Sequence, residues 1–432
     1  MSSSARHHPR KKWVLILAGT ALGIVLAVIA ANFVRSEKKI EHQVESPYGV
    51  ADAQFSRAIG SLLGRALLSG NSVTELLNGD QIFPSMLEAI GAAKQTITFE
   101  SFIYWSGDIG EKFAHALSAR ARAGVKVRIL LDWVGSVKMK EEWLKELKDA
   151  GCQVERYHAP KWYHLTRLNN RTHRKLLIVD GRIGFTGGVG IGDEWTGHAQ
   201  DSEHWRDTHF KVAGPVVAQM QAIFMVNWIK ARATVEHTVD FFPPLEPAGD
   251  QAAQMFDSSP DEGSENIRLM YLLSIAAARE SIYLEQSYFV PDNLIIQMLV
   301  SAAKRGVHIE IIMPGEHTDT RHVRQASRSR WGPLLEAGIE LYEYEPTNLH
   351  AKVMVVDGLW SSVGSTNFDN RAFRLNDEAN LNVYQREFAA QMMQTLANDK
   401  RLCQRVTLEA WQNRSRLQKL GDRFWALFRQ QM

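Results

Sequence analysis

Apolar residues recur along the chain in short runs that are typical of buried strands, separated by segments with helical spacing. Residues 95–105 (QTITFESFIYW) and 280–290 (ESIYLEQSYFV) are rich in the β-branched and aromatic residues that strands favour. Residues 121–132 and 303–314 each indicate the end of a helix, closed by a glycine and followed by a buried strand. This alternation predicts an α/β fold in which helices cover a sheet.

The pattern of the first half returns in the second. The clearest pair is HRKLLIVDGRIGFTGG at 173–188 and HAKVMVVDGLWSSVGS at 350–365, which align without a gap at an offset of 177. A period this long indicates a duplicated domain and not a solenoid. We therefore expect two tandem, similar α/β domains, each a mixed sheet flanked by helices, related by a pseudo-twofold axis. The boundary is expected in the Pro-, Gly- and acid-rich segment 242–265.

The N-terminal region predicts a membrane anchor. Residues 13–34 contain no charge across 22 positions, which is enough for a transmembrane helix. A cleaved signal peptide is the alternative, but the apolar core is longer than such a peptide needs and no A-x-A site closes it. Arg and Lys residues before the span favour a cytoplasmic N-terminus, whereas Arg35, Lys38 and Lys39 after it weaken that bias, so the membrane face of the body stays open.

These features divide the chain into six expected segments. They are a basic tail (1–12), a transmembrane anchor (13–34), a linker (35–60), a first domain (61–241), a second domain (242–400) and a C-terminal amphipathic helix (401–432). In the last segment apolar residues alternate with arginines and lysines at roughly helical spacing. That pattern fits a helix lying in a membrane interface and equally a helix docked on the second domain.

The charge and the cysteine content limit which binding partners, disulfides and metal sites we expect. A formal net charge of +2 lacks the basic excess that nucleic-acid binding proteins usually show, so no nucleic acid is expected as a partner. Two cysteines, Cys152 and Cys403, exclude a disulfide framework and a cysteine-based zinc site.

The repeated motif H-x-K-x4-D carries the candidate chemistry. Because His and Lys are two residues apart on a predicted strand, they project from the same face, whereas the aspartate has the opposite parity and begins an Asp-Gly turn. We therefore expect the aspartates to brace the turn and the active-site backbone, while His and Lys face the substrate. The two copies make six candidate catalytic residues: His173, Lys175, Asp180, His350, Lys352 and Asp357.

A paired His-Lys arrangement suits phosphoryl chemistry. Two lysines supply fixed positive charge for a phosphate and for the charge that develops in the transition state. A neutral imidazole can attack phosphorus while a second, protonated one donates to the leaving oxygen. One site between the halves would use all four groups, so neither a metal nor another cofactor is expected. His317, Asp319 and His322 could suggest a metal site, but Pro314 and Gly315 indicate a loop there and H-E-x-x-H is absent.

These motifs resemble the two signature motifs of the phospholipase D superfamily, and the segments RLNNRTHRKLLIVDG and VGSTNFDNRAFRLNDEANLNV resemble those of bacterial cardiolipin synthases. The resemblance covers residues 70 to 400 and implies a site at the domain interface with a phosphohistidine intermediate. The family's usual order makes His173 the nucleophile and His350 the acid, although the sequence itself does not distinguish them.

The resemblance also implies supporting residues. Asp207 and Glu378 stand where the family has an acid that orients a histidine. Gly188, Ser365 and Asn367 stand at phosphate-binding positions, but Gly190 replaces the asparagine that the family often has in the first half. Four arginines, which either line the route of an anionic head group or form a solvated helix face, are Arg321, Arg324, Arg328 and Arg330.

The implied function is phosphatidyl transfer between phospholipids at a bacterial inner membrane. Two phosphatidylglycerol molecules would yield cardiolipin and glycerol. Water as the acceptor would make the same residues a phospholipase D, and the superfamily also includes nucleases and other phosphodiesterases. A silent membrane scaffold is disfavoured because all six motif residues are present.

Overall fold

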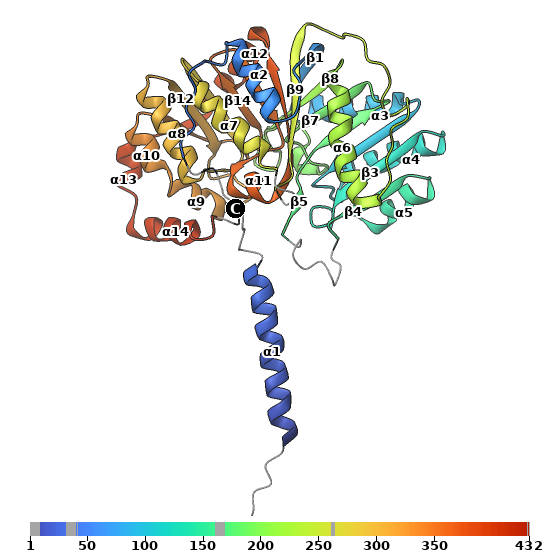
Figure 1. The fold of residues 1–432 in the computed structure, drawn as a ribbon, viewed down its shortest axis with the longest axis horizontal. Coiled ribbons are helices and arrows are strands. Elements are labelled where there is room, and N and C mark those ends of the chain that lie inside the picture. Colours follow the sequence, from blue (N-terminus) through green and yellow to red (C-terminus); the bar gives the residue numbers. More distant parts are fainter. Residues whose placement is uncertain are drawn as a thin grey trace, which may run out of the picture.

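The computed structural model describes residues 9–31, 40, 42–159, 169–260, 264–429 and 431. Helix α1 (Pro9–Ala31) stands apart from an α/β body, and apolar side chains such as Trp13 and Leu17 are exposed on it (Figure 1). Within the described ranges no helix meets the length and apolar character that crossing a membrane requires. The expected basic tail and anchor extend beyond the description, at residues 1–8 and 32–34.

One continuous sheet of 16 strands runs through the body. The first half contributes β1 (Leu68–Leu77), β2 (Thr96–Ser101), β3 (Lys126–Asp132), β4 (Gln153–Tyr157), β5 (Arg171–Thr172), β6 (Leu176–Val179), β7 (Ile183–Gly187) and β8 (Thr208–Ala213). The second half contributes β9 (Gln251–Ser258), β10 (Ser281–Gln286), β12 (His308–Pro314), β13 (Glu340–Tyr344), β14 (Lys352–Val356), β15 (Trp360–Gly364), β17 (Asn376–Tyr384) and β18 (Cys403–Val406). Strands β11 (Phe289–Val290) and β16 (Phe368–Asp369) form a separate pair.

The strand order repeats outward from the centre. Strands β1 and β9 pair antiparallel in the middle, with Leu68 opposite Ala253. On one side the order is β1-β8-β7-β6-β2-β3-β4, and on the other it is β9-β17-β15-β14-β10-β12-β13, with β18 added at the edge. In each half the three outer strands of this order are parallel and the others antiparallel. The expectation of two similar mixed-sheet α/β units is confirmed.

Helices cover both faces of the sheet (Figure 1). One face of the first half carries α3 (Asn78–Ala92), α4 (Asp108–Arg122) and α5 (Glu141–Asp149), and one face of the second half carries α7 (Asn266–Ala277), α8 (Asn293–Lys304) and α10 (Trp331–Glu336). The remaining face packs on α6 (Val217–Arg232) and α12 (Arg386–Lys400) through a core that contains residues of both halves. Because that core is shared, the halves are held together by apolar burial as well as by the sheet.

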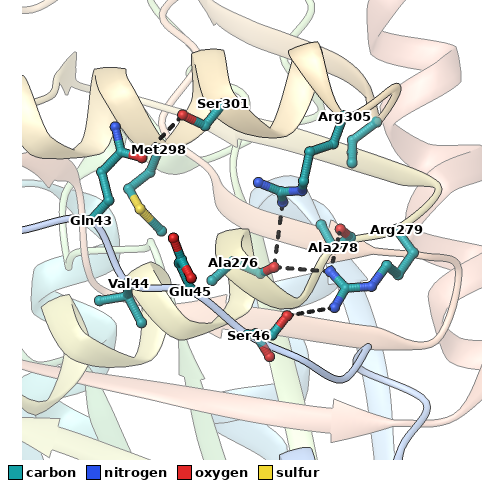
Figure 2. Close-up of a pocket in the computed structure, with 11 residues that line it drawn as sticks. Gln43, Val44, Glu45, Ser46, Ala276, Ala278, Arg279, Met298, Ser301 and Arg305 are labelled. Carbon is teal, nitrogen blue, oxygen red and sulfur yellow. Dashed lines mark hydrogen bonds between the residues drawn. The ribbon is translucent and has the colours of Figure 1, made fainter.

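Residues 35–60, expected as a linker, include a packed element. Helix α2 (Ala53–Leu62) buries Phe55 and Ile59 in the core of the second half, and the Phe55 ring meets Trp360 edge-on at 6.4 Å. Just before it, the guanidinium of Arg279 donates to the backbone oxygens of Ser46 and Tyr48 (Figure 2). The segment that precedes the first half in sequence is therefore fastened to the second.

The C-terminal region differs from the single amphipathic helix expected at 401–432. Strand β18 extends the sheet at β13, and two short helices follow, α13 (Leu408–Gln412) and α14 (Arg416–Ala426). The proposed division at residue 242 falls in the connection between α6 and β9.

The motif aspartates begin the turns after β6 and β14. Both have a positive φ, 53° at Asp180 and 52° at Asp357. The Asp180 carboxylate accepts hydrogen bonds from the backbone N–H groups of residues 94–96, and Asp357 does the same for residues 279–281. Since each aspartate lies at the opposite end of its strand from the motif histidine, the two brace backbone and stand apart from the reacting side chains.

We predict that Asp180→Ala lowers the free energy of unfolding by about 2 kcal/mol, because three backbone N–H groups lose a charged acceptor. Urea denaturation measures this. The matched control is the exposed Asp250, whose replacement by alanine should change stability by less than about 0.5 kcal/mol. Equal midpoints for the two variants would contradict the bracing role.

Candidate active site

The two motif histidines lie at the junction of the halves, and each is tied to the other half through its backbone. The N–H of His173 donates to the carbonyl of Asp377 at 2.8 Å, where β5 pairs with β17. The N–H of His350 donates to the carbonyl of Arg206 at 2.7 Å. This crossed pairing brings the start of each motif strand to the opposite half.

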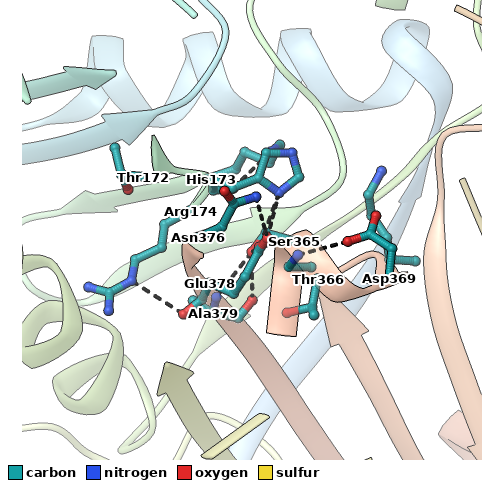
Figure 3. A network of polar contacts seen from close by, with 12 residues as sticks. Thr172, His173, Arg174, Ser365, Thr366, Asp369, Asn376, Glu378 and Ala379 are labelled. Atoms are coloured by element: carbon teal, nitrogen blue, oxygen red, sulfur yellow. Dashed lines mark hydrogen bonds and ion pairs between the residues drawn. The ribbon is translucent and has the colours of Figure 1, made fainter. Parts of the chain in front are cut away.

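The ring of His173 faces a carboxylate of the second half (Figure 3). Its Nδ1 lies 3.0 Å from Oε1 of Glu378. The Ser365 hydroxyl donates to Oε2 of Glu378 at 2.5 Å, and the Asn376 amide donates to Oε1 at 3.4 Å. These contacts leave Nε2 as the nitrogen of His173 that faces away from the carboxylate.

The ring of His350 faces a carboxylate of the first half. Its Nδ1 lies 2.7 Å from Oδ2 of Asp207. The Trp195 indole N–H donates to the same oxygen at 2.9 Å, and the Thr208 N–H donates to Oδ1 at 2.7 Å. Both expected orienting acids therefore contact a motif histidine, but each belongs to the half opposite its histidine, an exchange that the sequence does not reveal.

Trp195 is the site residue that sequence reasoning missed. It supplies to Asp207 the hydrogen bond that Ser365 supplies to Glu378. The equivalent of Ser365 is Gly188, where an added Cβ would lie 2.1 Å from Oδ1 of Asp207. The signal in the sequence was the loss of a side chain at Gly188 with a tryptophan seven residues later.

Because of Gly190, the two halves differ at a phosphate-binding position of the family. A Cβ there would lie 2.7 Å from Cβ of Ile103 and 3.2 Å from the Trp195 ring, so the asparagine common in the family does not fit. Its counterpart Asn367 is buried, and within the described part of the chain its Oδ1 has no hydrogen-bond partner. A side-chain amide is therefore available to a ligand from the second half alone.

The motif lysines lie beside the histidines. The ammonium group of Lys175 donates to the backbone oxygen of His173 at 2.8 Å, and that of Lys352 lies 3.0 Å from Nδ1 of His350. Aromatic rings wall the site. Phe102 lies 5.1 Å from the His173 ring, and Trp195 and Trp205 lie 5.2 and 5.6 Å from the His350 ring, measured between centroids.

Burial and mutual charge set the protonation states. Burial, together with the charges of Lys175 and Lys352, lowers the pKa of His173 well below its ordinary value. Burial and Lys352 also lower the pKa of His350, but there Asp207 opposes the shift. Burial lowers the pKa of Lys175 to about 7 and that of Lys352 to about 8.

The two carboxylic acids shift in opposite directions. Burial raises the pKa of Glu378 to about 8, although Lys175 acts against it. Burial also acts to raise the pKa of Asp207, but His350 and Lys352 outweigh it and hold that pKa below its ordinary value. Asp207 is therefore ionised beside His350 at neutral pH, whereas burial favours the neutral form of Glu378.

Comparison with known proteins agrees with this arrangement. Residues 86–228 and 271–400 match the family described as "Cardiolipin synthase, PLD-like domain". The chain belongs to this family. Cardiolipin synthase 2 of Staphylococcus epidermidis is 34% identical over 359 residues, which cover 82% of this chain and 73% of that protein. The major cardiolipin synthase of Bacillus subtilis is 35% identical over 347 residues, 80% of this chain and 72% of that protein.

A solved structure shares the fold of this cardiolipin synthase-family chain. The phosphatidylserine synthase of Haemophilus influenzae superimposes with a TM-score of 0.65 at 14% identity and covers 88% of this chain and all of that one. At this identity the likeness concerns the fold.

Several residues that the sequence suggested as metal ligands or head-group contacts instead contact other side chains of the protein. Asp319 accepts a hydrogen bond from the hydroxyl of Tyr288, and the His322 ring lies 5.2 Å from Trp425. Of the four arginines, Arg324 pairs with Glu343 and Arg328 with Asp422, both at 2.7 Å.

We predict that the site binds an anionic phosphate analogue more weakly as pH rises through 7 and 8. Lysines are charged below their pKa, and the pKa values of Lys175 and Lys352 are about 7 and 8. A phosphonate analogue of a phosphodiester, whose single charge is constant over this range, should lose about tenfold in affinity per pH unit for each lysine that must be protonated.

Isothermal titration from pH 6 to 9 at constant ionic strength makes this measurement. Lys175→Arg is the control, because a guanidinium stays charged throughout and should remove the step near pH 7. Affinity independent of pH in the unaltered protein would show that the lysines do not hold the phosphate.

Proposed function

We propose that this protein transfers a phosphatidyl group from one phosphatidylglycerol to a second, producing cardiolipin and releasing glycerol. The observation that carries the proposal is the crossed pair of histidine–acid contacts at the junction of the halves, with opposite charge preferences at the two acids. Family membership and the relatives named cardiolipin synthases support the choice of lipid.

In the first step His173 attacks the phosphodiester through Nε2, and His350 donates a proton to the departing glycerol oxygen. His173 suits the nucleophile's role because its lowered pKa keeps the imidazole neutral. His350 suits the acid's role because ionised Asp207 stabilises its imidazolium form. The P–O bond breaks, glycerol leaves, and a phosphatidyl-histidine forms.

Glu378 stabilises the positive charge that this step creates on His173. Once phosphorus is bonded to Nε2, the His173 ring carries positive charge and its Nδ1–H faces Glu378 at 3.0 Å. That charge strengthens the hydrogen bond that the Nδ1–H donates to the Glu378 oxygen. The acid thereby stabilises the intermediate more than the free histidine, as differential stabilisation requires.

The second step reverses the roles. Neutral His350 takes a proton from a glycerol hydroxyl of the second phosphatidylglycerol, whose oxygen attacks phosphorus and displaces His173. Lys175 and Lys352 stabilise the charge on the equatorial phosphate oxygens in both steps. Asn367 holds the phosphate from the second half, because the Ser365 hydroxyl donates to Glu378 and the Gly188 N–H donates to the carbonyl of Thr208. Neither step requires a metal or another cofactor.

We further propose that residues 13–34 attach the protein to a bacterial inner membrane, where its phospholipid substrates lie. The absence of charge over 22 residues and the exposed apolar side chains of α1 support this.

The first experiment is incubation of the purified, detergent-solubilised chain with labelled phosphatidylglycerol. We expect cardiolipin and glycerol, and a loss of roughly 10³-fold or more in His173→Asn because the nucleophile is gone. Thin-layer chromatography resolves the lipids. Phosphatidic acid as the sole lipid product would instead make the protein a phospholipase D.

The roles of the two histidines predict different responses to the leaving group. His350→Asn should slow turnover of phosphatidylglycerol by roughly 10²–10⁴-fold, because general acid catalysis is lost. A p-nitrophenyl phosphatidyl ester needs no protonation on departure, so His350→Asn should release nitrophenolate at nearly the unaltered rate in the first turnover. His173→Asn should remain inactive on both substrates. The reverse pattern would exchange the two assignments.

A further inference from the structure

Helix α14 docks on the body by the side that carries Asp422 and Trp425, and Trp425 packs on a small apolar cluster that includes Val323 and Ala326. Asp422, at 1% exposure, is the acid that fastens it, and it pairs with Arg328 of α9 (Arg321–Arg328) and with Arg414. A buried carboxylate that is left unpaired is costly, so these two arginines fix which side of the helix faces inward.

The opposite side of the helix is apolar and faces outward. At 100° per residue Leu417, Leu420 and Phe424 of α14 lie on one face, roughly opposite Asp422, and Leu427 and Phe428 follow in the turn after the helix. Their exposed fractions are large: Leu417 81%, Leu420 61%, Phe424 52%, Leu427 75% and Phe428 46%. A helix docked in water normally buries its apolar stripe, so this orientation is the reverse of the usual one.

Cations border the apolar face. Arg416, Lys419 and Arg423 lie along one edge of it, and the single acid of α14, Asp422, is neutralised beneath. An apolar face bordered by cations matches the surface of a bilayer that contains anionic lipid. Pairing with a second copy of the chain would bring these cations together, which favours the bilayer as occupant.

The chain continues from α14 to the rim of the active site. The Gln431 side chain accepts a hydrogen bond from Asn169 of the first half at 2.7 Å, and its backbone oxygen accepts one from Arg371 of the second half at 3.2 Å. The charge of Arg371 reaches His173, whose pKa it helps to lower. Helix α14 also lies on the same side of the body as α1 (Figure 1).

We propose that α14 lies in the interface of an anionic bilayer with Leu417, Leu420, Phe424, Leu427 and Phe428 inserted, and thereby seats the mouth of the active site at the head-group layer. The purpose assigned to this contact rests on the proposed function. The contact itself does not, since an interfacial helix would insert whether or not the site turns over lipid.

The test uses the full chain in nanodiscs that contain phosphatidylglycerol. An environment-sensitive fluorophore is attached at Leu420→Cys and, as a matched control, at Ala397→Cys, an exposed position on α12, which is labelled on the side of the body away from α14 in Figure 1. The unaltered protein, treated with the same fluorophore, measures the background labelling of the natural cysteines. Lipids with a quencher in the acyl chain should extinguish the label at 420 and spare the one at 397. Equal, weak quenching at both positions would overturn the proposal, as would disulfide cross-linking of 420 between copies.

A second measurement separates the role of α14 from the chemistry. The double variant Leu417→Ser with Leu420→Ser should lower the ratio of turnover on vesicles to turnover on a soluble short-chain phosphatidylglycerol by roughly tenfold. Gln394→Ser on α12 is the control and should leave that ratio unchanged. An unchanged ratio in the double variant would overturn the seating role. Absence of turnover on either lipid by the unaltered protein would refute the proposed function and leave the quenching result standing.

Discussion

The structure depends on one interaction: each reactive imidazole is held by a carboxylate from the other half of the molecule. His173 needs Glu378 and His350 needs Asp207, so neither half contains a complete histidine–acid pair. Buried ionisable groups are tolerated only when their partners are placed accurately. That requirement explains why the two halves share one sheet through β1 and β9 and one core beneath α6 and α12, because relative movement of the halves would separate both pairs.

The two pairs are equivalent in topology but not in chemistry. Asp207 is held ionised with the Trp195 indole and the Thr208 N–H as donors, whereas the longer Glu378 is buried with Ser365. Environments that push the pKa values of two like groups apart assign them to different roles. The lowered pKa of Asp207 and the raised pKa of Glu378 are the basis on which we propose His350 as the acid and His173 as the nucleophile.

The strands and their duplication could be predicted well from the sequence. The alternation of side chains along each strand and the paired motifs are local properties of the sequence. The expectation that His and Lys share one strand is wrong, because His173 and Lys175 lie before β6 and His350 lies before β14, where the chain crosses to the other half. What could not be predicted depends on contacts between distant segments: the exchange of carboxylates, the indole of Trp195 in place of a serine, and α2 packed on the second half. For α14 the periodicity identified an apolar face, but the direction it faces is set by Asp422 and two arginines.

A fully symmetric duplication would work poorly here. Two protonated imidazoles beside two lysines would place four positive charges in one buried site, and burial lowers the pKa values of all four groups, with repulsion from Lys352 adding to the shifts of His173, Lys175 and His350. Only one imidazole can therefore hold a proton at a time, and a symmetric pair would share it without preference. Gly188 and Gly190 make the two halves differ, since a Cβ at Gly188 would meet Asp207 and one at Gly190 would meet Ile103 and the Trp195 ring, and Trp195 donates to Asp207 beside His350 alone.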